Sequence, residues 1–358
     1  MSLDDVRHHD RPRRPPAPDH GRPGAARPPD TTAGPLRHLT RPLPLVTAPL
    51  KLAGHVGSQL AGAPGRVIGS LTAPARDDLR RDVRRSFGIP EAPRPPVADP
   101  EESYLPPGGV ARRVHGDLPS MVIGGLAALF LQTLHPLAMA GVAEHSGYKE
   151  DPTGRLRRTA SFVGWTTYGT KDEARKAIDQ VQRVHRRVHG TAPDGRSYSA
   201  ADPELVTWVH VAEVWSFLSA VERYGPGGRL TDDERDAYFA ETGVVALDLG
   251  AHWVPRTRDE ALAYFLRMRP ELYAGPQAMA ARDWLRRGVG RRVEDRVVYN
   301  VICAAAVGVL PGWARDDLRL PSPPLVDAAV VEPVARTLCA GIRWAITPPR
   351  PRPGGGAA

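Results

Sequence analysis

Apolar residues recur along most of this chain with the period of an α-helix. Over residues 171–189 they are spaced three or four positions apart and form one stripe on a helix. We expect further helices over residues 202–224, 231–249, 257–272, 291–310 and 331–346. Alternating patterns typical of strands are scarce, and neither a fixed repeat nor a glycine-rich phosphate loop occurs. The sequence therefore predicts an all-α fold.

Several of these segments begin with residues that favour the start of a helix. The stretches "TKDE", "SAADPE" and "LTDDE" each place acidic side chains in a first turn, next to a serine, threonine or aspartate that can cap the helix. We therefore expect helices to begin near residues 171, 202 and 231.

One apolar run is long enough to raise the question of a membrane span. Residues 121–143, "MVIGGLAALFLQTLHPLAMAGVA", contain no formally charged side chain. Polar residues and Pro136 interrupt its centre, and a proline ends or kinks a helix at the preceding residue. We expect two shorter buried helices that meet at "LHP"; a membrane span is the alternative.

The composition divides the chain into four parts. Residues 1–38 are rich in proline and arginine and are predicted to be a disordered tail. Residues 39–74 form a linker with an amphipathic stretch, which lies on the domain or on a membrane surface. We expect one helical domain over residues 75–348, beginning with a short basic helix at 75–88, and a disordered tail over 349–358.

The charge and the cysteines narrow the possible partners and compartment. The net charge is +8, but the cations are mostly scattered arginines with no nucleic-acid docking motif, so a nucleic-acid partner is not expected. Cys303 and Cys339 lie in apolar runs and are expected to be free, buried thiols. No secretion signal is recognised, and we expect a cytoplasmic protein.

Three histidines fall within apolar segments predicted to be helical, and they are the first candidates for chemistry. His185 lies on the apolar stripe of residues 171–189, while His135 and His210 lie in other apolar runs. A buried imidazole costs stability unless it is paired, so each could simply bind a backbone carbonyl. Three of them together favour a cofactor or an internal polar network. The spacing excludes the zinc motif HExxH, because no glutamate follows His185.

The order of several motifs resembles a known family. The stretch "LQTLHPLAMAGVAEHSGYKEDPTGRLRRTASF" is followed by "VHRRVHG" and then by "YSAADPELVTWVHVAEVWSFLSAVERYG". Together they resemble the oxygenase family of the latex-clearing (rubber oxygenase) and mpaB type over roughly residues 110–310. That family implies an all-helical fold with a globin-like core that holds haem b.

The resemblance also implies roles for individual residues. His185 matches the proximal iron ligand, and Arg155 and Thr159 of "RLRRT" match residues that line the distal side. Some latex-clearing proteins have a lysine where this chain has Arg158; arginine stays protonated and is a poor ligand, which argues against a closed state ligated through this position. His189 is the alternative ligand if the register shifts by one turn, or a partner of a haem propionate.

Two further histidines keep open roles. His135 could brace a helix junction or contact the cofactor, and His210 could be structural or line the pocket.

The resemblance predicts a haem-dependent oxygenase that uses dioxygen on the carbon–carbon double bond of a small apolar substrate, isoprenoid or otherwise unsaturated. Two alternatives stay open: a haem-binding sensor or carrier without turnover, and a non-haem helical protein that binds a partner or a metal. We expect any membrane association to be peripheral.

Overall fold

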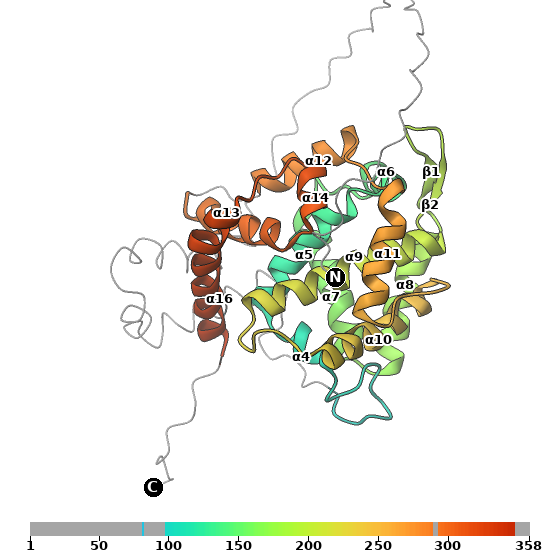
Figure 1. Cartoon of the computed structure of the whole chain (residues 1–358). Helices are drawn as coiled ribbons and strands as arrows, with labels where there is room; N and C mark the ends of the chain where they lie inside the picture. Colours follow the sequence, from blue (N-terminus) through green and yellow to red (C-terminus); the bar gives the residue numbers. More distant parts are fainter. Residues whose placement is uncertain (1–80, 82–96, 289–292, 348–358) are drawn as a thin grey trace, which may run out of the picture.

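The computed structural model describes residue 81, residues 97–288 and residues 293–347 of the 358-residue chain. The predicted tails (1–38 and 349–358), the linker 39–74 and most of the helix expected at 75–88 lie outside these residues. The described part is helical apart from one small hairpin, which confirms the all-α prediction (Figure 1).

The first half of the described chain forms α4 to α9 and the hairpin. The elements are α4 (Val110–His115), α5 (Leu118–Gln132), α6 (Pro136–His145), α7 (Pro152–Tyr168), α8 (Lys171–His185), β1 (His189–Thr191), β2 (Ser197–Ser199) and α9 (Pro203–Tyr224). The second half comprises α10 (Asp232–Leu249), α11 (Arg258–Met268), α12 (Pro276–Arg287), α13 (Val293–Val309), α14 (Gly312–Asp317), α15 (Pro324–Val326) and α16 (Glu332–Ile346), with a 3₁₀ turn at Arg269–Glu271 and a π turn at Asp327–Val331.

The packing of α5 along α9 forms the centre of the fold. Both helices are mostly buried, and α9 also contacts α4, α6, α10, α13 and α16. The two backbones approach closely at Gly124, where a Cβ atom would lie 2.9 Å from the Cα of Phe217 and 2.9 Å from the carbonyl oxygen of Ser216. Glycine is therefore required at this contact because any side chain would push α9 away.

The apolar run at 121–143 forms two helices, as predicted. α5 ends at Gln132 and α6 begins with Pro136, whose ring disfavours a helical conformation at His135 and removes one backbone donor. The two helices meet at 107°. No single helix in the described part is long and apolar enough to cross a membrane, although this bent pair reaches the required length and composition when taken together.

The predicted helix starts are confirmed. Thr170 and Thr231 each form a capping box with a glutamate three residues later, and Asp202 caps α9 through the backbone N–H of Glu204. These caps satisfy N–H groups that a helix cannot pair internally and so fix where α8, α9 and α10 begin.

Two predicted helices are longer than the observed ones. The helix expected over 171–189 ends at His185, and His189 lies in β1, paired with Ser199. The reason is tertiary: β2 pairs with the chain after α8, and the Tyr198 hydroxyl would lie 2.7 Å from a Cβ atom on Gly190. The helix expected over 257–272 ends at Met268 and continues as the 3₁₀ turn, where Pro270 lacks a backbone donor.

Partly buried ion pairs attach the C-terminal segment to α5 and α9. Figure 1 shows α16 on one side of these two helices. Arg343 of α16 donates to both carboxylate oxygens of Asp117 at 2.6 and 2.7 Å and to the carbonyl of Tyr224. Arg223 of α9 donates to Asp327 at 2.7 Å. Such bidentate, partly desolvated pairs fix orientation, so α16 is held in register with both central helices.

The close contact at Gly124 gives a test of this packing. Gly124→Ala should lower the free energy of unfolding by about 1–3 kcal/mol, because the new methyl group meets backbone atoms of α9. Gly125→Ala is the matched control, since its nearest neighbour would be a Phe217 ring carbon at 3.7 Å; it should be neutral or stabilising by up to about 1 kcal/mol. Urea unfolding measures both, and equal effects at the two glycines would contradict the assigned helix contact.

Candidate active site

Five of the seven candidate residues lie on three helices, α7, α8 and α9. Arg155, Arg158 and Thr159 are on α7, His185 is on α8 and His210 is on α9. α8 packs against α7 and α10, and α10 packs against α9. Gln182, one turn before His185, donates to the carbonyl of Asp248 on α10 at 2.8 Å. The fold therefore places the end of α8 beside α10.

His185 is partly covered by protein. The apolar stripe of α8 is buried at Ala174 and Ile178, but Val184 next to His185 is 52% exposed. The Nδ1 atom of His185 is buried and has no hydrogen-bond partner among the described residues. Desolvation lowers the pKa of His185, so its imidazole is neutral at pH 7. A neutral imidazole with free nitrogens is the form that binds a metal.

α7 brings Arg155 and Thr159 to one helix, one turn apart, as "RLRRT" predicted. Arg155 is half-buried and donates through Nη1 to the Ser146 hydroxyl at 2.6 Å. Thr159 is exposed. Arg158 is also exposed and forms an ion pair with Asp151 at 3.4 Å. Arg155 is therefore positioned by the corner between α6 and α7, while Arg158 is directed to the surface pair.

The other two histidines lie elsewhere. His135 is buried at the junction of α5 and α6, with its ring centroid 5.9 Å from that of Trp208. It is the residue before α6 and its side chain does not cap that helix. His189 is exposed in β1 and does not share a helix face with His185. The Nδ1 atom of His135 has no hydrogen-bond partner among the described residues, so the two roles expected for it stay open.

α9 is almost wholly buried but has one partly uncovered face. Within its central part, this face is formed by Val209, His210 and Glu213, which are spaced to lie on one side of the helix. Burial lowers the pKa of His210 to about 4 and raises the pKa of Glu213 to about 7. Desolvation therefore favours the neutral forms of both groups.

A hydrogen-bonded cluster lies beside this face and was missed by sequence reasoning. The His115 ring lies 2.8 Å from the Thr167 hydroxyl through Nδ1 and 3.0 Å from the Tyr238 hydroxyl through Nε2. It also meets the Phe217 ring edge-on at 5.6 Å. The charge of His210 further lowers the pKa of His115, and Glu213 raises that of Tyr238, so these groups are neighbours.

The sequence offered a weak signal for this cluster. Glu213 follows His210 by three positions in the longest apolar helix, where a carboxylate is out of place. His115 belongs to a six-residue helix, too short to show a periodic pattern. Only the packing of α4, α7, α9 and α10 brings the residues together.

The same helices leave apolar side chains exposed. In the described part of the chain, six such residues lie on α7 to α10: Leu156, Trp165, Val184, Val209, Val244 and Leu247. Leu156, which immediately follows Arg155, is 50% exposed. Val184 directly precedes His185, so exposed apolar surface and an unpartnered imidazole occur on the same helix, a combination that suits an apolar group held by one imidazole.

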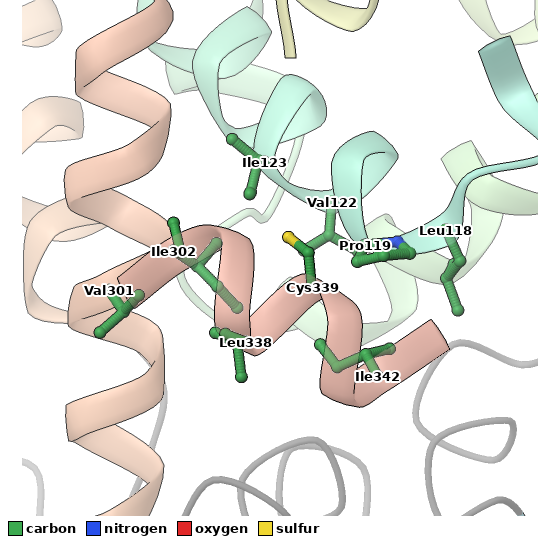
Figure 2. A pocket seen from close by; sticks show the side chains of 10 residues that line it. Leu118, Pro119, Val122, Ile123, Val301, Ile302, Leu338, Cys339 and Ile342 are labelled. Carbon is green, nitrogen blue, oxygen red and sulfur yellow. The ribbon is translucent and has the colours of Figure 1, made fainter. Parts of the chain in front are cut away.

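An apolar pocket elsewhere in the molecule is separate from these residues. It lies between α5, α13 and α16 and is lined by side chains such as Ile123, Ile302 and Cys339 (Figure 2). It has room for about one water and presents no polar surface. Within the described ranges, no three His, Cys, Asp or Glu residues are arranged to hold a metal ion.

A comparison with protein families gives one match. Residues 112–344 match the family described as "ER-bound oxygenase mpaB/B'/Rubber oxygenase, catalytic domain". This range contains α5 to α15 and every candidate residue discussed above. Neither the curated proteins nor the solved structures contain a match to the chain.

The raised pKa of Glu213 predicts a pH-dependent stability. Its carboxyl group ionises near 4.5 in an unfolded chain and near 7 in the fold, so ionisation favours the unfolded state between these values. Its stability contribution is present below pH 4.5 and is lost as the pH rises to 7. Glu213→Gln should therefore gain stability over the wild type across this window, by at most about 3 kcal/mol.

Urea unfolding between pH 5 and pH 8 measures this difference. The lowered pKa values of His115 and His210 stabilise the fold above pH 6.5, and this stabilisation is lost as the pH drops towards 4. Both histidines titrate in the wild type and in the variant, so their effects cancel to first order in the difference between the two proteins. Glu204→Gln, at an exposed position of the same helix, is the control. A difference between Glu213→Gln and wild type that stays constant with pH would contradict the interior position of this carboxyl.

Proposed function

Because the chain belongs to the oxygenase family of mpaB and the rubber oxygenases, we propose that it is a haem-b-dependent oxygenase. The substrate is a small apolar molecule, isoprenoid or otherwise unsaturated, whose carbon–carbon double bond is oxidised or cleaved with dioxygen. The observation that carries the proposal is the unpartnered Nδ1 of the neutral His185, on a helix that packs against α7 and α10 and, like them, leaves apolar side chains exposed.

His185 is the residue that would hold the haem iron. A single neutral imidazole leaves one coordination position open, and a haem so bound supplies an iron centre that activates dioxygen. The protein contributes the orientation of the ring, since the capping box at Thr170 and the buried residues Ala174 and Ile178 fix the start and the inner face of α8. Exposed apolar residues of α8 and of the helices packed against it would offer the apolar surface that such a group needs.

Arg155 and Thr159 of α7 would supply hydrogen-bond donors near the bound group. Arg155 carries a permanent charge, and burial lowers its pKa without removing that charge at pH 7. In a desolvated site, an oriented cation and a hydroxyl can stabilise negative charge that develops on oxygen atoms. The bond from Arg155 to Ser146 holds the guanidinium in place before any substrate binds.

Arg158 and the remaining histidines have supporting roles. Arg158 is paired with Asp151 at the surface and cannot lose its proton, so we do not expect it to ligate iron. His210 lines the interior face of α9 and His135 braces the α5–α6 junction. His189 is exposed in β1, the strand that follows α8. It can therefore contact a cofactor carboxylate or solvent.

Two experiments separate this function from its alternatives. An ultraviolet–visible spectrum of the purified protein, oxidised and then reduced with carbon monoxide, tests for a histidine-ligated haem with an open position. A folded but colourless protein, even when haem is supplied during expression, would favour a non-haem helical binding protein. A haem spectrum without dioxygen uptake on any unsaturated substrate would favour a sensor or carrier.

The ligand assignment is tested by substitution. His185→Ala should lose at least about tenfold in haem content, because removal of the one iron ligand leaves only apolar contacts. His189→Ala is the matched control and should retain its haem, since His189 lies in β1. Haem is quantified from the pyridine complex. Retention in His185→Ala with loss in His189→Ala would exchange the two roles.

Residues on α7 should affect turnover and leave haem content unchanged. Arg155→Ala and Thr159→Val each remove a donor and should reduce dioxygen uptake with squalene as a test alkene by about 10²-fold or more. Arg158→Ala, one residue from Thr159 but paired at the surface, is the control and should stay within about threefold of wild type. Carbonyl products and haem content are measured on the same samples. An equal loss in all three variants would indicate a general disturbance of α7 and contradict the assignment.

A further inference from the structure

The interior face of α9 carries two polar groups that the haem assignment does not use. The Nε2 atom of His210 is buried and has no hydrogen-bond partner in the described part of the chain. Glu213, one turn further along the same face, likewise forms no hydrogen bond with any described residue. An unsatisfied buried polar group costs about 1–3 kcal/mol, so the His210 nitrogen is expected to be paired with a group outside the described residues, and the half-buried Glu213 lies one turn away to share that partner.

The side chains next to this pair form hydrogen bonds with one another. Both ring nitrogens of His115 are engaged, one with Thr167 and the other with Tyr238. This closed cluster covers one side of the α9 face and has no ring nitrogen left for a ligand. His210 and Glu213 are therefore the polar groups of this face that remain available.

The electrostatics of Glu213 favour a neutral partner. Desolvation alone raises the pKa of Glu213 to about 7, and among the described residues no cationic side chain offsets it. The protonated acid, which is well populated near neutral pH, can donate a hydrogen bond, and His210 with its pKa near 4 is a neutral imidazole. An anionic group placed here would meet no compensating charge, whereas a hydroxyl group can both accept and donate.

We propose that His210 and Glu213 together bind a hydroxyl group at one end of an otherwise apolar substrate. The adjacent Val209 is partly exposed on the same face and would contact the hydrocarbon chain next to that hydroxyl. This inference rests on the proposed function for the identity of the site as a substrate site. It narrows the substrate class from unsaturated hydrocarbons to unsaturated alcohols.

The test compares three probes of one chain length: farnesol, farnesene and farnesoic acid. Their binding to the purified full chain is followed at pH 7 by quenching of tryptophan fluorescence, since Trp208 and Trp215 lie on α9. Wild type should bind farnesol at least about tenfold more tightly than farnesene, the effect expected of one or two hydrogen bonds. Farnesoic acid, ionised at this pH, should show no such advantage.

Variants assign the preference to the pair. Glu213→Leu and His210→Leu should each bring the ratio of the two dissociation constants close to one, and Glu213→Gln, which keeps a donor and an acceptor, should retain part of it. Val209→Ala is the matched control: it should weaken farnesol and farnesene alike and leave the ratio unchanged. Thermal unfolding and circular dichroism test whether each variant is folded. If Glu213→Leu does not fold, Glu213→Gln is used in its place.

The outcomes separate this inference from the proposed function. A ratio near one in wild type, or a preference that survives both leucine substitutions, would overturn the inference and indicate that water satisfies the pair. Stronger binding of farnesoic acid than of farnesol would also overturn it. An alcohol preference in a protein without a haem spectrum would sustain the inference and contradict the haem proposal. A haem spectrum and turnover of hydrocarbons, without a preference for the alcohol, would sustain the haem proposal and contradict the inference.

Discussion

The close packing of α5 against α9 is the contact on which the site depends. Because Gly124 has no side chain, the two helices approach at backbone distance, and α9 becomes the central element of the fold. Nearly every other side of α9 is then covered by protein. Among its less covered positions are Val209, His210 and Glu213 in the middle of the helix, where desolvation favours the neutral forms of His210 and Glu213.

This interior is kept nearly free of net charge although the chain is basic. Desolvation lowers the pKa values of His115, His185 and His210 and raises that of Glu213, so burial favours the neutral form of each. The arginines on either side of His185 in "RVHRR" are exposed, whereas Arg155 is half-buried and bonded to Ser146. A neutral interior suits an imidazole ligand and an apolar substrate, and the exposed charge keeps the molecule hydrated.

The proposed function divides this region into two parts with different tasks. α7 and α8 carry the residues assigned to the cofactor and to oxygen, namely Arg155, Thr159 and His185. α9 carries the pair assigned to the polar end of the substrate. α10 contacts both α8 and α9 and so fixes their relative position, with Gln182 bonded to the α10 backbone on one side and Tyr238 next to His115 on the other.

Local patterns in the sequence determined the helical class, the capped starts of α8, α9 and α10, and the break at Pro136. They also placed Arg155 and Thr159 on one helix. These features could be predicted because helix caps, proline and the helical period act within a few residues. The motif order also identified the oxygenase family. Tertiary structure alone decided that α8 ends at His185, since β2 pairs with the chain beyond it. It also decided that His115, His210, Glu213 and Tyr238 are neighbours, because residues more than a hundred positions apart meet only when four helices pack together.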